Sequence, residues 1–471
     1  MGKRLGAGLL CLLLFGGCGG KDMYYVETIG EVAGIGNEAQ AYAEDKTRKK
    51  DAEYENLEAA SSISGEYYYE EGTGKQSAAG EGMSNAVVEI ISETAQDMGQ
   101  KDEINSSILE TPGTKTVDLS FFSKMLPGSE VRRMIEMVVY PELPYLNELP
   151  LTDGDRKAIE ARRNLEGIPP AVEVSFGVLT DNTSVRSFPT WDKSSSEIGS
   201  MAFDYFQQTM LTVGEGVAVL HRTADGIWCF VQGETYSGWI ETASVAFCSQ
   251  AEMLNLSRPQ QVLVALDQMK LENKNIRMGT VFALENVKEQ YYTVRMPSKS
   301  EDGTLRIQYV QISKSEPVHE GYLPFDWNLI LEQAGKLKGM PYGWGDTGGN
   351  MDCSSTMCSV YKCFGIRLPR DTSGQSLMCG IQLEGLAAEE KQEILRGLKP
   401  GTLLYMPGHV MMYLGEEEGE PRILHNVTAY SENGDTIYAQ QCCITGLDIM
   451  RMNGESYWDS LTGAWELCTE P

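Results

Sequence analysis

Cys353 stands in the sequence where a reactive thiol is expected. A glycine-rich stretch leads into Asp352, and an apolar segment of helical spacing (357–364) follows and ends at Gly365. Because Asp is a favoured helix N-cap, this order predicts that Cys353 lies in the first turn of a helix. The unpaired amides and the helix dipole there favour thiolate over thiol and can hold a developing oxyanion. The pattern predicts a cysteine nucleophile; a buried structural cysteine is the alternative.

A thiol nucleophile needs a nearby base, and the chain has only 4 histidines. His409 begins a strand-like stretch 56 residues after Cys353 (409 − 353), and His425 lies in the next such stretch, 16 residues on (425 − 409). Adjacent strands can bring two such side chains together. We therefore predict that His409 is the general base and that His425 orients it. His221 and His319 are interpreted as structural or exposed.

Two strand-rich regions precede the nucleophile. Each contains short β-branched and aromatic segments separated by turn residues, at 216–221, 227–232 and 238–241 in the first region and at 280–285, 291–296 and 305–312 in the second. A hairpin is expected at Asp302-Gly303. These patterns predict two small β-barrels in tandem, at 173–248 and 249–316.

The region before the barrels has two parts. Residues 116–172 are expected to form a helical stabilising segment, with helical spacing from Phe121 to Met125 and a second helix from Asp153 to Glu166 capped by Thr152 or Asp153. Residues 19–115 are weakly hydrophobic and of mixed charge. They predict a flexible acidic tether.

The first 18 residues are typical of an export signal. A short positive start is followed by an apolar run (5–15) and by small residues that end at Cys18. This pattern resembles a bacterial lipoprotein signal, which implies lipidation of Cys18 and anchoring of the exported protein to the membrane at the cell envelope. A plain secretory signal is the alternative.

Composition excludes other classes of protein. The chain of 471 residues carries a formal net charge of −28, which leaves no basic excess for binding nucleic acid. Of its 11 cysteines, two lie in the signal, and the remaining 9 (11 − 2) form no C-x-x-C pair. An odd number of scattered cysteines favours neither a disulfide scaffold nor a zinc ribbon.

The motifs taken together resemble the NlpC-type family of cell-wall cysteine peptidases. In chain order they are Gly-x-Pro-Tyr-x-Trp-Gly (339–345), Asp352-Cys353-Ser354, Leu368-Pro369-Arg370-Asp371-Thr372 with Gln375, Pro400-Gly401 and His409-Val410. The resemblance covers roughly residues 321–430 and implies an α+β, papain-like peptidase domain (317–471) preceded by two SH3-like barrels. It implies Cys353, His409 and His425 as the catalytic residues and no metal or cofactor. Asp346-Thr347 departs from the family pattern, in which a further Gly often follows, and is expected not to affect the chemistry.

The branch of this family with tandem SH3-like modules cleaves the γ-D-glutamyl to diamino-acid bond of peptidoglycan stem peptides. The resemblance therefore implies a cysteine endopeptidase that acts on stem peptides or muropeptides. Two alternatives stay open: a non-catalytic wall-binding lipoprotein, and an amidase or acyltransferase on the same scaffold.

The expected substrate contacts come from two parts of the chain. Near the nucleophile these are the Tyr342 hydroxyl at the oxyanion, Ser354, and the segment Arg370-Asp371-Thr372 facing the substrate. In the resembling branch, an acidic residue and a tyrosine of the first barrel hold the free α-amine of an N-terminal L-Ala. The matching residues here are Glu215 and Tyr236, with Asp352 able to share the ammonium.

Overall fold

The computed structural model describes residues 12–14, 23–25, 100–199 and 203–467. The predicted lipidation site Cys18 and nearly all of the predicted signal and of residues 19–99 lie outside the described residues. Two short strands, β1 (Leu12–Leu14) and β2 (Met23–Tyr25), pair with each other. None of the helices in the described ranges has the length and apolar character needed to cross a membrane.

Residues 100–110 are helical and pack onto the C-terminal part of the chain. Ile108 is 4% exposed within the core that also contains Cys353. The Asn105 side chain donates to the Gly365 carbonyl (2.9 Å) and accepts from the Arg367 amide (2.9 Å). The predicted end of the tether at residue 115 is therefore wrong, because residues 100–110 form a helix that packs against distant parts of the chain.

The segment 116–172 combines helices with short strands. The helices are α3 (Gly128–Glu136), α4 (Asp153–Arg162) and the 3-10 turn η1 (Leu165–Gly167); the strands are β3 (Met125–Pro127), β4 (Tyr145–Leu146), β5 (Leu149–Pro150) and β6 (Ala171–Glu173). Thr152 caps α4 through a capping box with Asp155, as expected, but the helix ends before Glu166. The helix expected from Phe121 to Met125 is absent, because Met125 instead pairs with Glu173 across β3 and β6.

The first predicted barrel is a seven-stranded antiparallel sheet around the fully buried Trp239. Its strand order is β10-β8-β13-β12-β11-β7-β14, with β7 (Ser175–Leu179), β8 (Thr183–Arg186), β10 (Gln207–Leu211), β11 (Gly216–Arg222), β12 (Trp228–Gln232), β13 (Ser237–Glu241) and β14 (Val245–Cys248). The short strand β9 (Ser194–Ser195) and the 3-10 turn η2 (Thr242–Ser244) complete this region. Leu119, Val131 and Ile135 share one of its cores, so the preceding segment packs against the barrel.

The second strand-rich region follows helix α5 (Gln250–Ser257) and has a core of its own. A five-stranded antiparallel sheet has the order β20-β19-β18-β15-β21, with β15 (Val262–Ala265), β18 (Val281–Val287), β19 (Tyr291–Lys299), β20 (Leu305–Ser313) and β21 (Val318–Glu320). A hairpin pairs β16 (Met269–Leu271) with β17 (Lys274–Ile276). The predicted hairpin at Asp302-Gly303 is confirmed, since Lys299 pairs with Leu305 across it.

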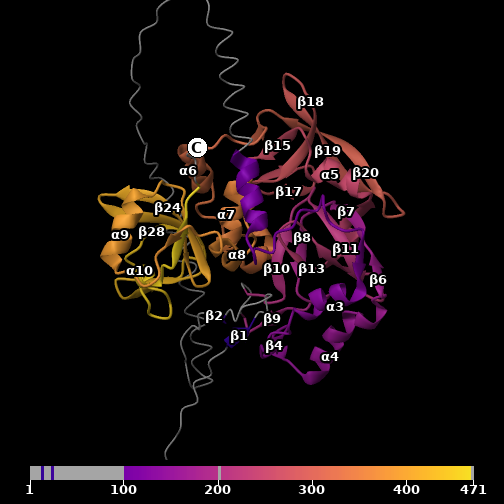
Figure 1. Cartoon of the computed structure of the whole chain (residues 1–471), viewed down its shortest axis with the longest axis horizontal. Helices are drawn as coiled ribbons and strands as arrows, with labels where there is room; N and C mark the ends of the chain where they lie inside the picture. Colours follow the sequence, from indigo (N-terminus) through magenta and orange to yellow (C-terminus); the bar gives the residue numbers. More distant parts are fainter. Residues whose placement is uncertain (1–11, 15–22, 26–99, 200–202, 468–471) are drawn as a thin grey trace, which may run out of the picture. The chain divides into compact units, whose positions relative to one another are not determined.

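The C-terminal region is an antiparallel sheet of order β22-β29-β23-β24-β25-β28 flanked by helices, which confirms the α+β class. Helix α7 (Cys353–Lys362) packs against β24 (His409–Glu417) and β25 (Glu420–Val427), while α9 (Ala388–Gly397) and α10 (Tyr457–Ser460) lie on the other side (Figure 1). The other elements are α6 (Trp327–Lys336), η3 (Trp344–Gly349), α8 (Thr372–Ser376), β22 (Ile381–Gln382), β23 (Leu403–Met406), β26 (Tyr430–Glu432), β27 (Asp435–Ile437), β28 (Gln441–Gly446) and β29 (Gly463–Trp465). Residues 100–467 belong to one compact unit.

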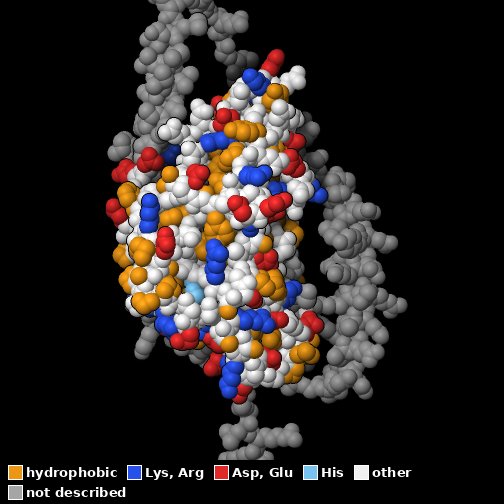
Figure 2. Space-filling view, turned by 90° about the vertical axis from the view of Figure 1, so that its right-hand side faces the viewer, with side chains coloured by type: hydrophobic (Ala, Val, Ile, Leu, Met, Phe, Trp, Pro, Cys, Tyr) orange, Lys and Arg blue, Asp and Glu red, His pale blue; other side chains and the backbone are white. Residues whose placement is uncertain are grey.

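The surface charge is mixed where it can be seen. On the face shown in Figure 2, acidic and basic side chains are interspersed and no field of one sign covers it. The net charge of −28 is therefore not concentrated on this face.

Candidate active site

Helix α7 begins at the nucleophile, as the sequence predicts. Asp352 is its N-cap: the carboxylate accepts from the Ser355 amide (2.9 Å), and the Ser355 hydroxyl closes the capping box. Cys353 is the first helical residue, is 8% exposed, and has its Sγ 3.6 Å from the Thr372 hydroxyl. The eight cysteines that the structure describes are all free, and Cys353 alone lies at a helix start after a capping Asp.

The two predicted catalytic histidines are in contact. His409 opens β24, His425 lies in the neighbouring β25, and His409 Nε2 is 3.0 Å from His425 Nδ1. His425 is fully buried, and its Nε2 lies 3.3 Å from the Thr445 hydroxyl. A neutral His409 that donates through Nε2 keeps Nδ1 as an acceptor for a proton. This arrangement matches a base oriented by a second imidazole.

Strand pairing brings this histidine pair to the start of α7. The backbone of Val410, next to His409, lies close enough to Cys353 to lower the pKa of its thiol. Asn426, next to His425, donates to the Met351 carbonyl (2.8 Å) and to the Thr356 hydroxyl (3.3 Å). Residues on both sides of Cys353 are thus bonded to β25, which places the predicted nucleophile beside the strands that carry the predicted base.

Burial sets the resting protonation state of this site. It raises the pKa of Cys353 to about 11, and the Asp352 carboxylate adds to the rise, while bonds from Thr372 and Val410 and the Arg370 charge only partly offset it. Burial, and then the charges of His425 and Arg451, hold the pKa of His409 well below 6.5. The expected thiolate is therefore not the resting form, because desolvation outweighs the helix dipole. In the predicted reaction, His409 therefore takes the thiol proton during attack, as a general base.

This state predicts where activity is lost in acid. Because His409 must be unprotonated and its pKa is lowered, kcat/KM is expected to persist below pH 6.5 and to fall only at more acid pH. The measurement is kcat/KM between about pH 4 and pH 9, with samples held at each pH and then assayed at pH 7 to separate unfolding from titration. An acid limb centred at or above pH 6.5 would contradict this protonation state.

Arg370 is placed differently from its prediction. Arg370 is 7% exposed, and its guanidinium is engaged inside the protein with Asp352 (2.8 Å), Asp346 (3.2 Å) and the Ser354 hydroxyl (2.9 Å). The Asp352 carboxylate also accepts from the Gly345 amide (3.1 Å) and from the Ser354 hydroxyl (3.1 Å). These oxygens are engaged inside the protein, so the structure does not support a role for Asp352 in holding a substrate ammonium, and that role stays a prediction.

Asp371 stabilises the helix start at Thr372. It is the N-cap of α8 and accepts from the Gly374 amide (2.7 Å), and its other oxygen pairs with Lys115 (3.0 Å). These bonds fix the start of α8, where Thr372 reaches Cys353. Thr372 therefore contacts Cys353, and Asp371 stabilises the helix start that positions Thr372.

Glu215 lies away from the nucleophile. Its carboxylate is 2.6 Å from Lys362 Nζ, and Lys362 ends the 10-residue α7 that Cys353 begins. At the α-helical rise, the two ends are roughly 13 Å apart. The structure therefore does not support the predicted contact of Glu215 with the substrate amine, and that contact stays a prediction. The Tyr236 hydroxyl donates to Gln208 (2.9 Å), whose amide donates to the Tyr205 carbonyl (3.1 Å), and its binding role stays a prediction.

The first barrel reaches the site through aromatic residues that the sequence reasoning missed. The Phe203 ring lies 6.0 Å from Tyr342 and 5.9 Å from Trp344, and Tyr205 lies 5.7 Å from Trp344. Burial, and then the charges of Cys353 and Asp352, raise the pKa of Tyr342 well above 10, so its hydroxyl stays protonated as a donor. No pattern around Phe203 and Tyr205 sets them apart from barrel core residues, so only folding reveals their place.

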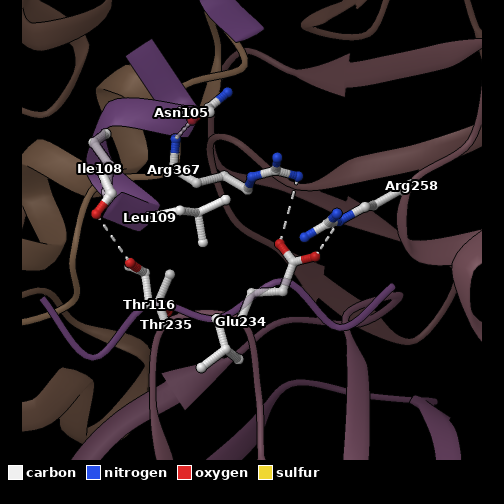
Figure 3. A pocket seen from close by; sticks show the side chains of 9 residues that line it. Asn105, Ile108, Leu109, Thr116, Glu234, Thr235, Arg258 and Arg367 are labelled. Carbon is white, nitrogen blue, oxygen red and sulfur yellow. Dashed lines mark hydrogen bonds and ion pairs between the residues drawn. The ribbon is translucent and has the colours of Figure 1, made fainter. Parts of the chain in front are cut away.

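A small cavity lies elsewhere in the structure. It has a volume of about 10 Å³, room for about one water molecule, and lies between the helix at 100–110, Glu234, Arg258 and Arg367. Figure 3 shows the Glu234 carboxylate between the two guanidinium groups, with Arg367 3.6 Å from it. The charged side chains around this cavity pair with one another, and none of the predicted catalytic residues lines the cavity. Within the described ranges, no group of His, Cys, Asp and Glu side chains could hold a metal ion.

Two family matches agree with this geometry. Residues 339–463 match the NlpC/P60 family, and residues 189–241 match an SH3 domain of the SH3b1 type. The chain contains an NlpC/P60 domain. Because NlpC/P60 proteins are cysteine peptidases, the match supports a peptidoglycan-hydrolase enzyme, and it does not support a non-catalytic binding protein. The SH3 match ends at residue 241, so the SH3-like character of the second sheet stays a prediction.

Known proteins resemble the chain over much of its length. A γ-D-glutamyl-L-lysine dipeptidyl-peptidase of Bacillus cereus (strain ATCC 10987 / NRS 248) is 23% identical over 278 residues, which are 55% of this chain and 74% of that protein. The solved structure of an NlpC/P60 endopeptidase from Photobacterium damselae subsp. piscicida is 22% identical with a TM-score of 0.60, covering 72% of this chain and 83% of the other. An NlpC/P60 family protein from Bacillus cereus ATCC 10987 has 17% identity and a TM-score of 0.44, over 62% and 99% of the two chains. The Photobacterium structure shares the fold of this chain.

Proposed function

We propose that the protein hydrolyses the γ-D-glutamyl to diamino-acid bond of peptidoglycan stem peptides that begin with a free L-Ala. The observation that carries this proposal is the aromatic contact between the first barrel and the loop before Cys353, with Phe203 6.0 Å from Tyr342. We infer that a barrel at this position limits the room for substrate on the N-terminal side of the cleaved bond. The 23% identical relative that is named a γ-D-glutamyl-L-lysine dipeptidyl-peptidase supports the same bond.

The proposed reaction is acyl transfer through a thioester. Cys353 Sγ attacks the γ-carbonyl carbon of D-Glu while its proton passes to His409, and the oxyanion is held by amides at the start of α7 and by the Tyr342 hydroxyl. His409 returns the proton to the nitrogen of the diamino acid as the C–N bond breaks. Water then gives a proton to His409 and cleaves the thioester, which restores the thiol and releases the L-Ala-D-Glu carboxylate.

The free amine is proposed to meet aromatic rings. Glu215 and Asp352 are already paired inside the protein, whereas Phe203, Tyr342 and Trp344 are half-buried rings close to the nucleophile loop. An ammonium group is attracted to the face of such rings within about 6 Å. The same rings leave an acetylated or glycan-linked N-terminus without a favourable contact.

Export belongs to the same proposal. The sequence of residues 1–18 supports secretion to the cell envelope and lipid anchoring at Cys18. An anchored enzyme that accepts free N-termini would act on released wall peptides at the membrane and not on intact, glycan-linked wall.

We expect the free stem peptide L-Ala-γ-D-Glu-diamino acid to be cleaved at least about a hundredfold faster, as kcat/KM, than its N-acetylated form. Mass spectrometry of the products identifies the bond, since release of L-Ala-D-Glu marks the γ-glutamyl cut. Peptides with diaminopimelate and with Lys, tested in parallel, determine the preferred diamino acid.

Phe203→Ala is expected to reduce this preference, and Tyr309→Ala, at an exposed aromatic of β20, is the matched control. Equal cleavage of the free and acetylated peptides would remove the N-terminal requirement. Release of a different fragment would instead favour an amidase or acyltransferase.

A further inference from the structure

Four buried charged side chains form an alternating chain behind the nucleophile. Arg277 pairs with Asp346 (3.3 Å), Asp346 with Arg370 (3.2 Å), and Arg370 with Asp352 (2.8 Å), the N-cap of α7. None of the four residues is more than 8% exposed. Asp346 also accepts from the Met210 amide (3.3 Å) and the Thr209 hydroxyl (3.4 Å) of the first barrel. The Asp346 carboxylate thus contacts the first barrel, the second strand-rich region through Arg277, and the segment after α7 through Arg370.

Asp346 is held in a conformation that favours glycine. Its φ is +66° and its ψ is 24°, the left-handed region that non-glycine residues rarely adopt. A side chain kept there against this preference points to a role for its carboxylate. Burial on its own would raise the pKa of Asp346, but Arg277 and Arg370 outweigh it and hold the pKa below its ordinary value. Asp346 is therefore ionised, and its negative charge is balanced by Arg277 and Arg370.

Arg277 comes from the turn that joins β17 to β18, in the second strand-rich region. In this turn Met278 is buried in the core that contains Cys353, and a Cβ on Gly279 would lie 2.8 Å from the Ser359 carbonyl of α7. The turn therefore packs directly against the nucleophile helix, and Arg277 extends from it to Asp346 and the Asn350 carbonyl (3.4 Å).

We infer that Arg277 and Asp346 are positioning residues of the peptidase: they anchor Arg370, whose two-pronged pairing with Asp352 fixes the start of α7 and the direction of the Cys353 thiol. The second strand-rich region, which contributes no side chain to the catalytic triad, thereby acts on catalysis through a buried ion chain. This inference rests on the proposed role of Cys353 as the nucleophile. It goes beyond the expectation that the Asp346 departure leaves the chemistry unaffected.

The inference is tested in the full chain by Arg277→Met, with Arg277→Lys as the conservative variant and Arg306→Met, at an exposed arginine of β20, as the matched control. Arg277→Met leaves Asp346 to draw Arg370 away from Asp352, so kcat is expected to fall about tenfold with KM within about twofold. Arg277→Lys is expected to recover most of the loss, and Arg306→Met to match wild type. A change in KM without a change in kcat, or no recovery of kcat in Arg277→Lys, would overturn the positioning role.

The reactivity of the Cys353 thiol gives a second test of the inference. Alkylation of Cys353 by iodoacetamide, followed by peptide mapping, needs no substrate, and it is expected to slow about threefold in Arg277→Met as the Asp352 charge beside the thiol becomes less compensated. An unchanged alkylation rate together with unchanged kcat overturns the inference; wild-type protein that is alkylated but cleaves no stem peptide overturns the proposed function instead.

Asp346→Gly is the alternative test if Arg277→Met does not fold, because glycine accepts the positive φ while the side chain with its carboxylate is removed. Its matched control is Glu418→Gly, at an exposed position with φ +56°. If Asp346→Gly folds, its kcat is expected to be about tenfold lower than that of the wild type. A wild-type kcat in this variant would overturn the inference.

Discussion

Cys353→Ala is expected to reduce hydrolysis of stem peptides by at least about ten-thousandfold, with little change in thermal stability. The thiol is the only atom group lost, and its neighbours at the start of α7 are held by Asp352 and Ser355 through backbone and hydroxyl bonds that do not involve sulfur. The measurement is kcat/KM on a free stem peptide, together with the midpoint of thermal unfolding.

Cys358→Ala is the matched control, one turn and a half further along α7. Cys358 is buried, and its Sγ donates to the Pro369 carbonyl (3.5 Å) and accepts from Gln375 (3.4 Å). Removing it is expected to lower the free energy of unfolding by about 1–2 kcal/mol while kcat stays near wild type. Turnover near wild type in Cys353→Ala, or loss confined to Cys358→Ala, would show that Cys353 is not the nucleophile.

His409→Ala is expected to lower kcat by about a thousandfold or more, whereas His425→Asn is expected to lower it only about tenfold to a hundredfold. His409 is the predicted acceptor of the thiol proton, and His425 is the histidine that contacts it, at 3.0 Å. An Asn at 425 can still accept from the His409 ring and orient it.

The histidine variants are compared with His319→Ala, because His319 lies in β21 and bonds only locally, to the Gly321 carbonyl (3.1 Å). That variant is expected to keep wild-type kcat. Equal and complete loss in His409→Ala and His425→Asn would mean that His425 takes part in proton transfer and does not merely orient His409.

The amino-acid sequence by itself determined the parts of the site that depend on local chemistry. Asp352 caps α7 because Asp at an N-cap satisfies amides within the next turn, a signal confined to a few residues. His409 and His425 begin or occupy consecutive strands, and consecutive strands usually pair, so their contact was also within reach of the sequence. The hairpin at Asp302-Gly303 follows from turn residues alone.

Only the tertiary structure decided which charges meet. Glu215 precedes a strand that resembles its family pattern, yet it pairs with Lys362, which lies 147 residues away in the chain. Arg370 and Asp346 read as loop residues, but folding buries them against Arg277 and Asp352. Burial likewise reversed the expected state of Cys353, since desolvation depends on neighbours from distant segments and not on the helix start. Ion pairing and burial are long-range properties, and a local pattern carries no information on the partner that the fold supplies.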